Sequence, residues 1–441
     1  MSFIYSLSLS LSFSPLMYRF STRRMEMAAA LLLALAGCVV VMIAYLVTRR
    51  PRLSMLKTRL TTASSEISKS RRRVSGASVA MGVGPGAPVP TPTMTTTSGS
   101  GAVGLFSWRG RHVVVTGGSS GIGFAIAEKV LRRGASVTLL ARDRRRLEEG
   151  ALELARRCDC LRRRGGDDDH HRDELDEGRI GWCSVDVADY SRVRRAVESS
   201  EVRRGRVGVV VCSAGMSAPG IFCSEARLDT DACTGARAAA TRAEREVEMC
   251  RNQMRINWEG SVNTVHACLG SVTSRPDGRV VLISSQAGQV GLFGYAGYSS
   301  SKFALRGFAE ALQMEVLPHD CRVCVAYPPD TDTPQLAQEE SSKPEELKAI
   351  TGAEVPFKPE RVATAIVRGI ERGDFCISVG FDGWMLGTLT AGMSPASHGD
   401  ALGSLVGVCV MGLLRTVALV YIHSWYNTII RIADRRRRKI S

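Results

Sequence analysis

The chain has 441 residues, of which 44% are hydrophobic, and it carries a formal net charge of +15 at pH 7. This length leaves room for one large domain with appendages. Only eight of the 58 basic residues are lysine, and the arginines are spread over every segment instead of lining one face. The sequence has no basic stretch interleaved with aromatic residues, so its charge does not indicate a nucleic-acid partner.

The 13 cysteines are an odd number without a disulfide-like spacing, which favours reduced thiols facing the cytosol. Cys321 and Cys324 form C-x-x-C in an apolar run that reads as a strand, where an odd offset places them on opposite faces. We therefore expect no redox pair there. We expect no metal site either, because a second group fits no standard zinc-ligand spacing: Cys158, Cys160, His170, His171 and Cys183.

Residues 28–47, AAALLLALAGCVVVMIAYLV, contain no charge and are long enough to cross a bilayer as one helix. Flanking arginines lean slightly to the C-terminal side, which favours a cytosolic location for the rest of the chain. A cleaved signal peptide is the alternative, although the run is long for one and no A-x-A site follows it. We expect a transmembrane anchor at 28–47, after an N-terminal extension at 1–27 without fixed structure.

Residues 48–107 are predicted to be a flexible linker, because the stretch GVGPGAPVPTPTMTTTSGSG at 82–101 cannot bury a core. At the other end, residues 386–441 combine an apolar segment at 401–414 with a basic tail. This segment is too short to span a bilayer and favours a re-entrant or interfacial, membrane-associated segment. The tail RRRRKIS is similar to a dilysine-type retrieval signal for the endoplasmic reticulum; a basic patch that contacts anionic lipid is the alternative.

A nucleotide-binding unit is predicted to open at 112–117, where the β-branched run HVVVTG ends in glycine. GGSSGIG follows, and then FAIAEKVLRRG with the apolar spacing of a helix. Strand, glycine-rich turn and helix are typical of a dinucleotide-binding fold, in which glycines let backbone N–H groups approach a pyrophosphate. The predicted cofactor-binding turn contains Gly117, Ser119, Ser120, Gly121, Ile122 and Gly123.

Further apolar runs predict a second strand at 136–142 and a third strand that ends just before Asp186. Three more strands are predicted at 207–215, 279–285 and 321–327. Because they alternate with helical stretches, they indicate an α/β fold with a parallel sheet and helices on both faces. The second strand ends at Arg142, and a cation there suits the 2′-phosphate of NADP; one more arginine in an arginine-rich chain is the alternative. Asp186 is expected at the adenine edge.

Residues 284–302, SSQAGQVGLFGYAGYSSSK, contain two tyrosines and end in lysine. If a helix begins near Gly297, Tyr298 and Lys302 lie at i and i+4 on one face. A lysine ammonium at that distance favours the phenolate, which would lower the pKa of Tyr298 and let it exchange a proton near neutral pH. A surface tyrosine and lysine are the alternative, since Y-x-x-x-K alone is a weak pattern.

TGGSSGIG, the strand ending in SS and Y-x-x-x-K together resemble the short-chain dehydrogenase/reductases over about residues 110–335. The resemblance implies a Rossmann-like, doubly wound catalytic domain, which we place at 108–385, and hydride transfer between NAD(P) and a carbonyl or alcohol. PPDTDTP at 328–334 and FDGWMLGTLTAGMSP at 381–395 resemble the branch of that family that acts on 3-ketosphinganine.

This narrower resemblance implies NADPH-dependent reduction of a long-chain keto-amine lipid, 3-ketosphinganine, to sphinganine. It also implies a location at the endoplasmic reticulum membrane, with the catalytic domain facing the cytosol. A membrane-anchored reductase of the same fold acting on a steroid, retinoid or fatty-acyl ketone is one alternative. A non-catalytic nucleotide-binding scaffold is the other. Many relatives form dimers or tetramers, so a homo-oligomer is compatible with the resemblance.

The motifs also imply roles for single residues. Tyr298 matches the proton donor, and Lys302 matches the residue that lowers the tyrosine pKa and holds the nicotinamide ribose. Ser285, with Ser284 as its neighbour and rival, matches the serine that binds the substrate oxygen. Two further residues match by position: Asn257, the asparagine that helps hold a relay water, and Thr333, the threonine at the nicotinamide carboxamide.

Some positions depart from the family pattern. Cys212 stands where relatives carry an asparagine that braces the sheet and borders the cofactor. Tyr295 has no catalytic counterpart and is expected to line the substrate mouth or to pack. Residues 158–178 and about 225–248 are expected to be surface insertions. The apolar entrance is expected from the segments around 336–357 and 381–395.

Overall fold

The computed structural model describes residues 106–163, 173–176, 178–222, 236–351, 355–392, 394–395, 415, 422–423, 425–436 and 438. All of them belong to one compact unit, Ala102–Ser441. The predicted anchor at 28–47 and the apolar segment at 401–414 lie outside the described residues. Within the described parts, no helix is both long and apolar enough to cross a membrane.

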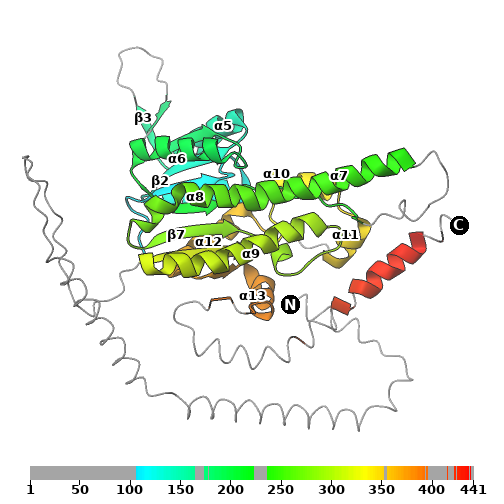
Figure 1. Cartoon of the computed structure of the whole chain (residues 1–441). Coiled ribbons are helices and arrows are strands. Elements are labelled where there is room, and N and C mark those ends of the chain that lie inside the picture. The colour runs from blue at the N-terminus through cyan, green and yellow to red at the C-terminus, as the bar shows by residue number, and fades with distance from the viewer. Residues whose placement is uncertain are drawn as a thin grey trace, which may run out of the picture. The chain divides into compact units, whose positions relative to one another are not determined.

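A central sheet runs through the domain (Figure 1). Its seven parallel strands have the order β5-β2-β1-β6-β7-β8-β9. The strands are β1 (His112–Thr116), β2 (Ser136–Ala141), β5 (Ile180–Ser184), β6 (Val207–Cys212), β7 (Gly278–Ile283), β8 (Cys321–Tyr327) and β9 (Cys376–Ser378). The order reverses between β1 and β6, and ligands of such sheets bind beside the carboxyl ends at the reversal.

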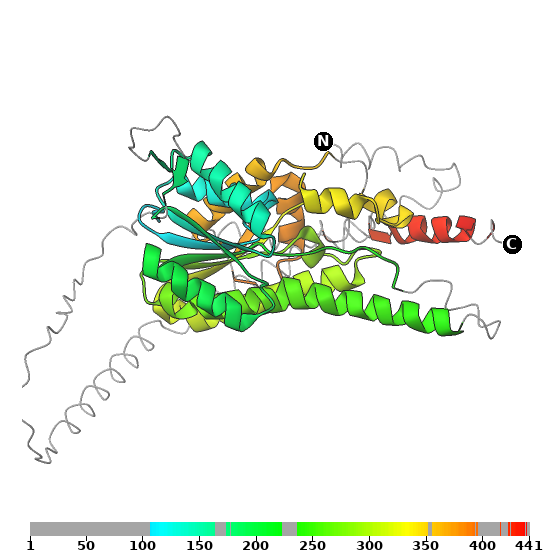
Figure 2. The ribbon, with the colours of Figure 1, turned by 90° about the horizontal axis from the view of Figure 1, so that it is seen from above.

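Helices cover both faces of the sheet (Figure 2). One layer contains α4 (Gly121–Leu131), α5 (Arg144–Arg157) and α12 (Pro359–Arg372). The other contains α6 (Tyr190–Arg204), α8 (Gly260–Thr273) and α9 (Ala296–Val316). Because the central strands are buried on both faces, they read as continuous valine-rich runs. The predicted doubly wound α/β fold is confirmed.

All six predicted strands are present, and the structure adds β9, whose three residues carry too little pattern to predict a strand. It also adds a small antiparallel hairpin of β3 (Leu161–Arg163) and β4 (Asp173–Leu175), in a segment expected to be a surface insertion. Cys321 and Cys324 lie on opposite faces of β8, as their offset predicts.

The remaining elements of the described structure are helices and helical turns. They are α7 (Ala236–Met254), the π-helical turn η3 (Arg255–Glu259), the 3-10 turns η4 (Gln286–Gly288) and η5 (Leu317–His319), α10 (Pro334–Glu340), α11 (Glu345–Thr351), α13 (Gly380–Leu389) and a C-terminal helix at 425–436. Part of α7 falls in the second expected insertion, and the described side chains from Arg245 to Cys250 are mostly exposed.

Candidate active site

The structure gathers the four predicted catalytic residues at the carboxyl ends of β6 and β7. Ser285 is the second residue after the end of β7, and its side chain hydrogen bonds Tyr298. Tyr298 and Lys302 lie on the first turns of α9, which begins at Ala296 and so gives them the predicted i, i+4 spacing. Asn257 lies in the η3 turn and donates its side-chain N–H to Ser301 Oγ at 2.8 Å. Ser301 lies between Tyr298 and Lys302 in the sequence of α9.

Lys302 is buried beneath the ring of Tyr298. Its Nζ lies 5.6 Å from the ring centroid and donates a hydrogen bond to the carbonyl of Ile283 at 2.9 Å. Burial disfavours the charged ammonium and lowers the Lys302 pKa to about 8. The charge of this lysine is therefore sensitive to pH changes just above neutral.

Tyr298 does not have the depressed pKa that its i, i+4 lysine predicts. Burial raises the Tyr298 pKa to about 12; the hydrogen bond with Ser285 lowers it, and the negative charge of Asp330 raises it further. The expectation of a pKa near neutral pH is wrong, because the lysine ammonium faces the ring and a backbone carbonyl and burial dominates. Tyr298 is thus a neutral phenol, a form that can donate a proton.

The two serines after β7 point to different partners. The Ala287 N–H donates to Ser285 Oγ at 3.2 Å, which fixes the hydroxyl that also meets Tyr298. Ser284 is buried and donates to the carbonyl of Lys302 at 3.0 Å. Of the two, Ser285 is the one beside the phenol.

Asn257 is fully buried and uses its whole amide within the protein. Its Oδ1 accepts the Met216 N–H at 2.7 Å, and its Nδ2 donates to the Met216 carbonyl at 2.9 Å as well as to Ser301. Ser301 in turn donates to the carbonyl of Tyr298 at 2.7 Å. Asn257 therefore ties the loop after β6 to the first turn of α9. Asn257 lies in a π-helical turn, and such turns are frequent at functional sites.

The turn between β1 and α4 has the shape of an anion-binding cradle. Gly117 and Gly121 have positive φ values of 65° and 59°, and a Cβ on Gly123 would lie 2.5 Å from the Gly117 carbonyl oxygen. Ser120, at the N-cap of α4, makes no side-chain capping bond within the described structure, so the first amides of the helix remain available. These residues fit a cofactor pyrophosphate.

The other predicted cofactor residues surround this turn. Thr333 caps α10 by accepting the Leu336 N–H at 3.2 Å, and its methyl group would lie 3.0 Å from a Cβ on Gly121. Arg142 is exposed directly after β2. Asp186, after β5, accepts the Ala188 N–H and lies 3.6 Å from the Arg255 guanidinium. Ser119 and Ile122 lie within the turn itself, where Ile122 packs against the core.

Thr116, which the sequence did not single out, links the two central strands at this edge. Its Oγ1 accepts the N–H groups of Ser213 and Ala214, both at 3.0 Å. The neighbouring Cys212 is buried, its thiol directed to the Ser261 carbonyl at 3.7 Å, and burial raises the pKa of that thiol to about 12. Cys212 is thus a neutral thiol, and the strand ends are braced by Thr116 beside it.

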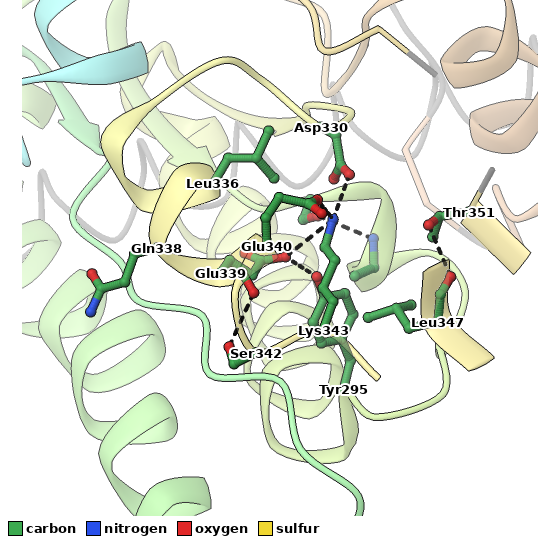
Figure 3. Close-up of polar contacts among 12 residues, drawn as sticks. Tyr295, Asp330, Leu336, Gln338, Glu339, Glu340, Ser342, Lys343, Leu347 and Thr351 are labelled. Atoms are coloured by element: carbon green, nitrogen blue, oxygen red, sulfur yellow. Dashed lines mark hydrogen bonds and ion pairs between the residues drawn. The ribbon is translucent and has the colours of Figure 1, made fainter. Parts of the chain in front are cut away.

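An ion-pair cluster centred on the buried Lys343 lies next to Tyr295, on the side of the site expected to hold the substrate (Figure 3). The Lys343 ammonium lies 2.9 Å from Asp330 Oδ2, and it also contacts Glu340 and, at 3.8 Å, Glu339. Tyr295 donates its hydroxyl to Glu339. Burial lowers the Lys343 pKa, but its carboxylate partners outweigh this effect and keep the pKa raised. The cluster joins α10 to the loop after β8; the acidic run around Lys343 is its only signal in the sequence.

Tyr295 packs within the protein beside Tyr298, with ring centroids 5.2 Å apart. Both tyrosines belong to an apolar cluster with Leu347 and Ile350 of α11, inside the predicted entrance segment 336–357. The other predicted entrance segment, 381–395, forms α13, whose Gly387 lies close to Gln289 in the loop after β7.

Comparison with known proteins identifies the family. Residues 111–344 match the family described as short chain dehydrogenase. The 3-ketodihydrosphingosine reductase of Bos taurus is 41% identical over 333 residues, which cover 75% of this chain and 89% of that protein. The 3-dehydrosphinganine reductase of Danio rerio and the 3-ketodihydrosphingosine reductase of Mus musculus are each 40% identical over 324 residues, covering 73% of this chain and 86% of theirs. The chain therefore belongs to the short-chain dehydrogenase family, whose reductases use a nicotinamide cofactor.

Proposed function

We propose that this protein reduces 3-ketosphinganine to sphinganine in sphingolipid synthesis, with NADPH as the reductant. The observation that carries the proposal is the hydrogen-bonded Ser285–Tyr298 pair with Lys302 beneath it, in a chain about 40% identical to reductases named for this substrate. Among the described residues of the site, none favours a steroid, retinoid or fatty-acyl ketone, and the relatives' names favour the keto-amine lipid.

In this proposal, Ser285 and Tyr298 bind the ketone oxygen of the substrate. Tyr298 donates the proton, since its pKa of about 12 keeps the hydroxyl protonated throughout the physiological range. Ser285 stabilises the negative charge that develops on the oxygen. The Lys302 ammonium, held at the ring face, stabilises the phenolate that remains. Asn257 holds the first turn of α9 and the loop after β6 in place. The bound nicotinamide supplies the hydride.

NADPH is proposed over NADH because of Arg142. The turn at Gly117–Gly123 fits the pyrophosphate of either cofactor, whereas the exposed guanidinium after β2 suits the additional 2′-phosphate. Thr333 is proposed to contact the carboxamide, and Asp186 to border the adenine.

We further propose that the protein acts at the endoplasmic reticulum membrane with its catalytic domain in the cytosol. The predicted anchor and a lipid substrate support this location. So do Phe381 and Trp384 on α13, which are 66% and 55% exposed with ring centroids 5.8 Å apart, because exposed aromatic pairs favour a membrane interface. Protease protection in microsomes tests the orientation. A homo-oligomer also belongs to the proposal, and sedimentation of the purified protein tests it.

A substrate panel tests the proposed reaction. Detergent-extracted protein is assayed for NADPH oxidation with 3-ketosphinganine, and in parallel with steroid, retinoid and fatty-acyl ketones, each with NADH as the second reductant. Turnover of 3-ketosphinganine with NADPH is the expected result. Turnover of another ketone class without 3-ketosphinganine would replace the substrate, and NADPH binding without any turnover would favour the scaffold alternative.

A further inference from the structure

The C-terminal helix, residues 425–436, presents one face to the protein and one to solvent. Half-buried positions recur at helical spacing and form a single stripe, which contains Trp425, Thr428, Ile429, Ile432, Ala433 and Arg436. Tyr426 and Ile430 lie on the opposite face and are 59% and 56% exposed. Both ribbon views show this helix beside α11 (Figures 1 and 2).

This half-buried stripe packs against the substrate side of the site. Trp425 and Ile429 join the apolar cluster that contains Tyr295, Leu347 and Tyr298, the proposed proton donor. Within this cluster four side chains are buried, and the others are half-buried and so keep accessible apolar surface: Leu292, Phe293, Tyr298, Trp425 and Ile429. The reacting group and the C-terminal helix thus contribute side chains to one apolar cluster.

An ion pair with a buried carboxylate holds the helix in this position. The Arg436 guanidinium lies 3.0 Å from Glu346 Oε1 of α11. Glu346 is only 1% exposed, and within the described residues its Oε2 has no hydrogen-bond partner. A buried carboxylate is unfavourable unless a cation pairs with it. Arg436 therefore fixes the end of the helix at the same α11 that supplies Leu347 and Ile350 to the cluster.

We propose that the C-terminal helix is one wall of the substrate site, and that the alkyl chain of the ketone lies against Trp425 and Ile429. This inference rests on the proposed function, since it takes the substrate to be a long-chain ketone. When Tyr298 binds the carbonyl oxygen, the chain attached to that carbonyl needs apolar surface next to it, and the accessible members of this cluster provide it. Arg436 and Glu346 are positioning residues, because they fix the wall and do not contact the chain.

The wall makes chain length a determinant of turnover. Each methylene removed from water adds roughly a factor of four in affinity. Loss of the wall should therefore lower kcat/KM strongly for a long-chain ketone and much less for a short-chain analogue, which has fewer methylenes to place against Trp425 and Ile429. A variant that only disturbs folding would lower both to the same extent.

The test compares Trp425→Ala and Ile429→Ala with Tyr426→Ala and Ile430→Ala, which change the solvent-facing side of the same helix. Each variant is assayed on 3-ketosphinganine and on an analogue with a chain of about eight carbons. We expect kcat/KM for the long chain to fall at least tenfold in the first pair, chiefly through KM, and less than threefold for the short chain. An equal fall in kcat/KM for both ketones, or no fall for the long-chain ketone, would contradict the proposal that this helix is a wall of the substrate site.

The ion pair is tested in the same assay by Arg436→Gln, with Arg435→Gln as the exposed control. We expect Arg436→Gln to lose part of the preference for the long chain, less than Trp425→Ala or Ile429→Ala does. Arg435→Gln should keep the wild-type preference. Wild-type activity on 3-ketosphinganine reports on the proposed function, whereas the long-to-short ratio among variants reports on the wall, so the two can fail separately.

A binding readout answers the question even without turnover. A 3-ketosphinganine carrying a terminal diazirine is photolysed on the full-length protein in detergent, and the tryptic peptide 416–431 is sequenced by mass spectrometry. Label on Trp425 or Ile429 supports the wall. Label confined to Tyr426 and Ile430, or absent from this peptide, would contradict it.

Discussion

On the cofactor side of the site, the turn between β1 and α4 takes its shape from the backbone, with Gly117 and Gly123 packed too closely for side chains. On the substrate side, the shape depends on ion pairs that join separate elements, each with one buried partner. Lys343 pairs with Asp330 there, and Glu346 pairs with a residue of the C-terminal helix. Substitutions on the two sides should therefore have different consequences: cofactor affinity on one, stability and substrate preference on the other.

The largest effect is expected where the two sides meet, at the paired tyrosines. Tyr298→Phe removes the proposed donor and should lower kcat by about 10²- to 10⁴-fold with little change in NADPH affinity. Tyr295→Phe is the matched control, because it removes the neighbouring hydroxyl and its bond to Glu339. That change should cost about 1–2 kcal/mol of unfolding free energy and preserve most turnover. Similar kcat losses in both would refute the donor assignment.

On the substrate side, Lys343→Met removes the cation shared by the buried Glu339 and the half-exposed Asp330 and Glu340. We expect the free energy of unfolding to drop by about 1–3 kcal/mol and KM for the ketone to rise. Lys348→Met changes an exposed lysine of the adjacent helix and should stay within about 0.5 kcal/mol. Urea denaturation checks both. Equal stability of the two variants would show that the ion-pair cluster does not hold this side together.

On the cofactor side, Gly123→Ala places a Cβ 2.5 Å from the Gly117 carbonyl oxygen, a backbone atom that cannot move aside cheaply. We expect NADPH affinity to fall by about 10- to 100-fold in calorimetric titration, while long-chain preference is retained. Gly270→Ala on α8 is the control, because a Cβ there meets no atom of the described residues within 4 Å and alanine favours a helix. An unchanged NADPH affinity in Gly123→Ala would contradict the proposal that the turn between β1 and α4 binds the pyrophosphate.

Cofactor choice gives a smaller and more selective effect. Arg142→Ser should raise the Kd for NADPH by about tenfold and leave that for NADH unchanged, because only the 2′-phosphate contact is lost. Arg145→Ser removes an exposed arginine that pairs with Glu149 instead. If Arg142→Ser weakened the binding of NADPH and NADH equally, Arg142 would not be the residue that contacts the 2′-phosphate.

The pH dependence should follow Lys302 and not Tyr298. Burial lowers the Lys302 pKa to about 8, so its charge is present below that pH and is lost as the pH rises through it. We expect kcat/KM to be level below about pH 7, about twofold lower at pH 8 and declining further above. Lys302→Arg, which stays charged, should remove this decline. A wild-type profile level to pH 10 would assign no role to the lysine charge.

The same contrast explains what the sequence could predict. The glycine turn, the valine-rich strands and the spacing of Tyr298 and Lys302 are local patterns, and the structure has them where they were expected. The Glu346–Arg436 pair joins distant segments, and no periodicity signals it. The Tyr298 pKa was mispredicted for a related reason: spacing gives the distance to a charge, whereas desolvation depends on everything that packs around the phenol.

The most direct test of the central claim is the identity and labelling of the product. Protein, 3-ketosphinganine and NADPH deuterated at the transferred position are incubated, and the lipids are analysed by mass spectrometry. The account predicts sphinganine with one deuterium at the carbinol carbon from wild type and almost none from Tyr298→Phe. Oxidation of NADPH without labelled sphinganine, or undiminished labelled sphinganine from Tyr298→Phe, would contradict it.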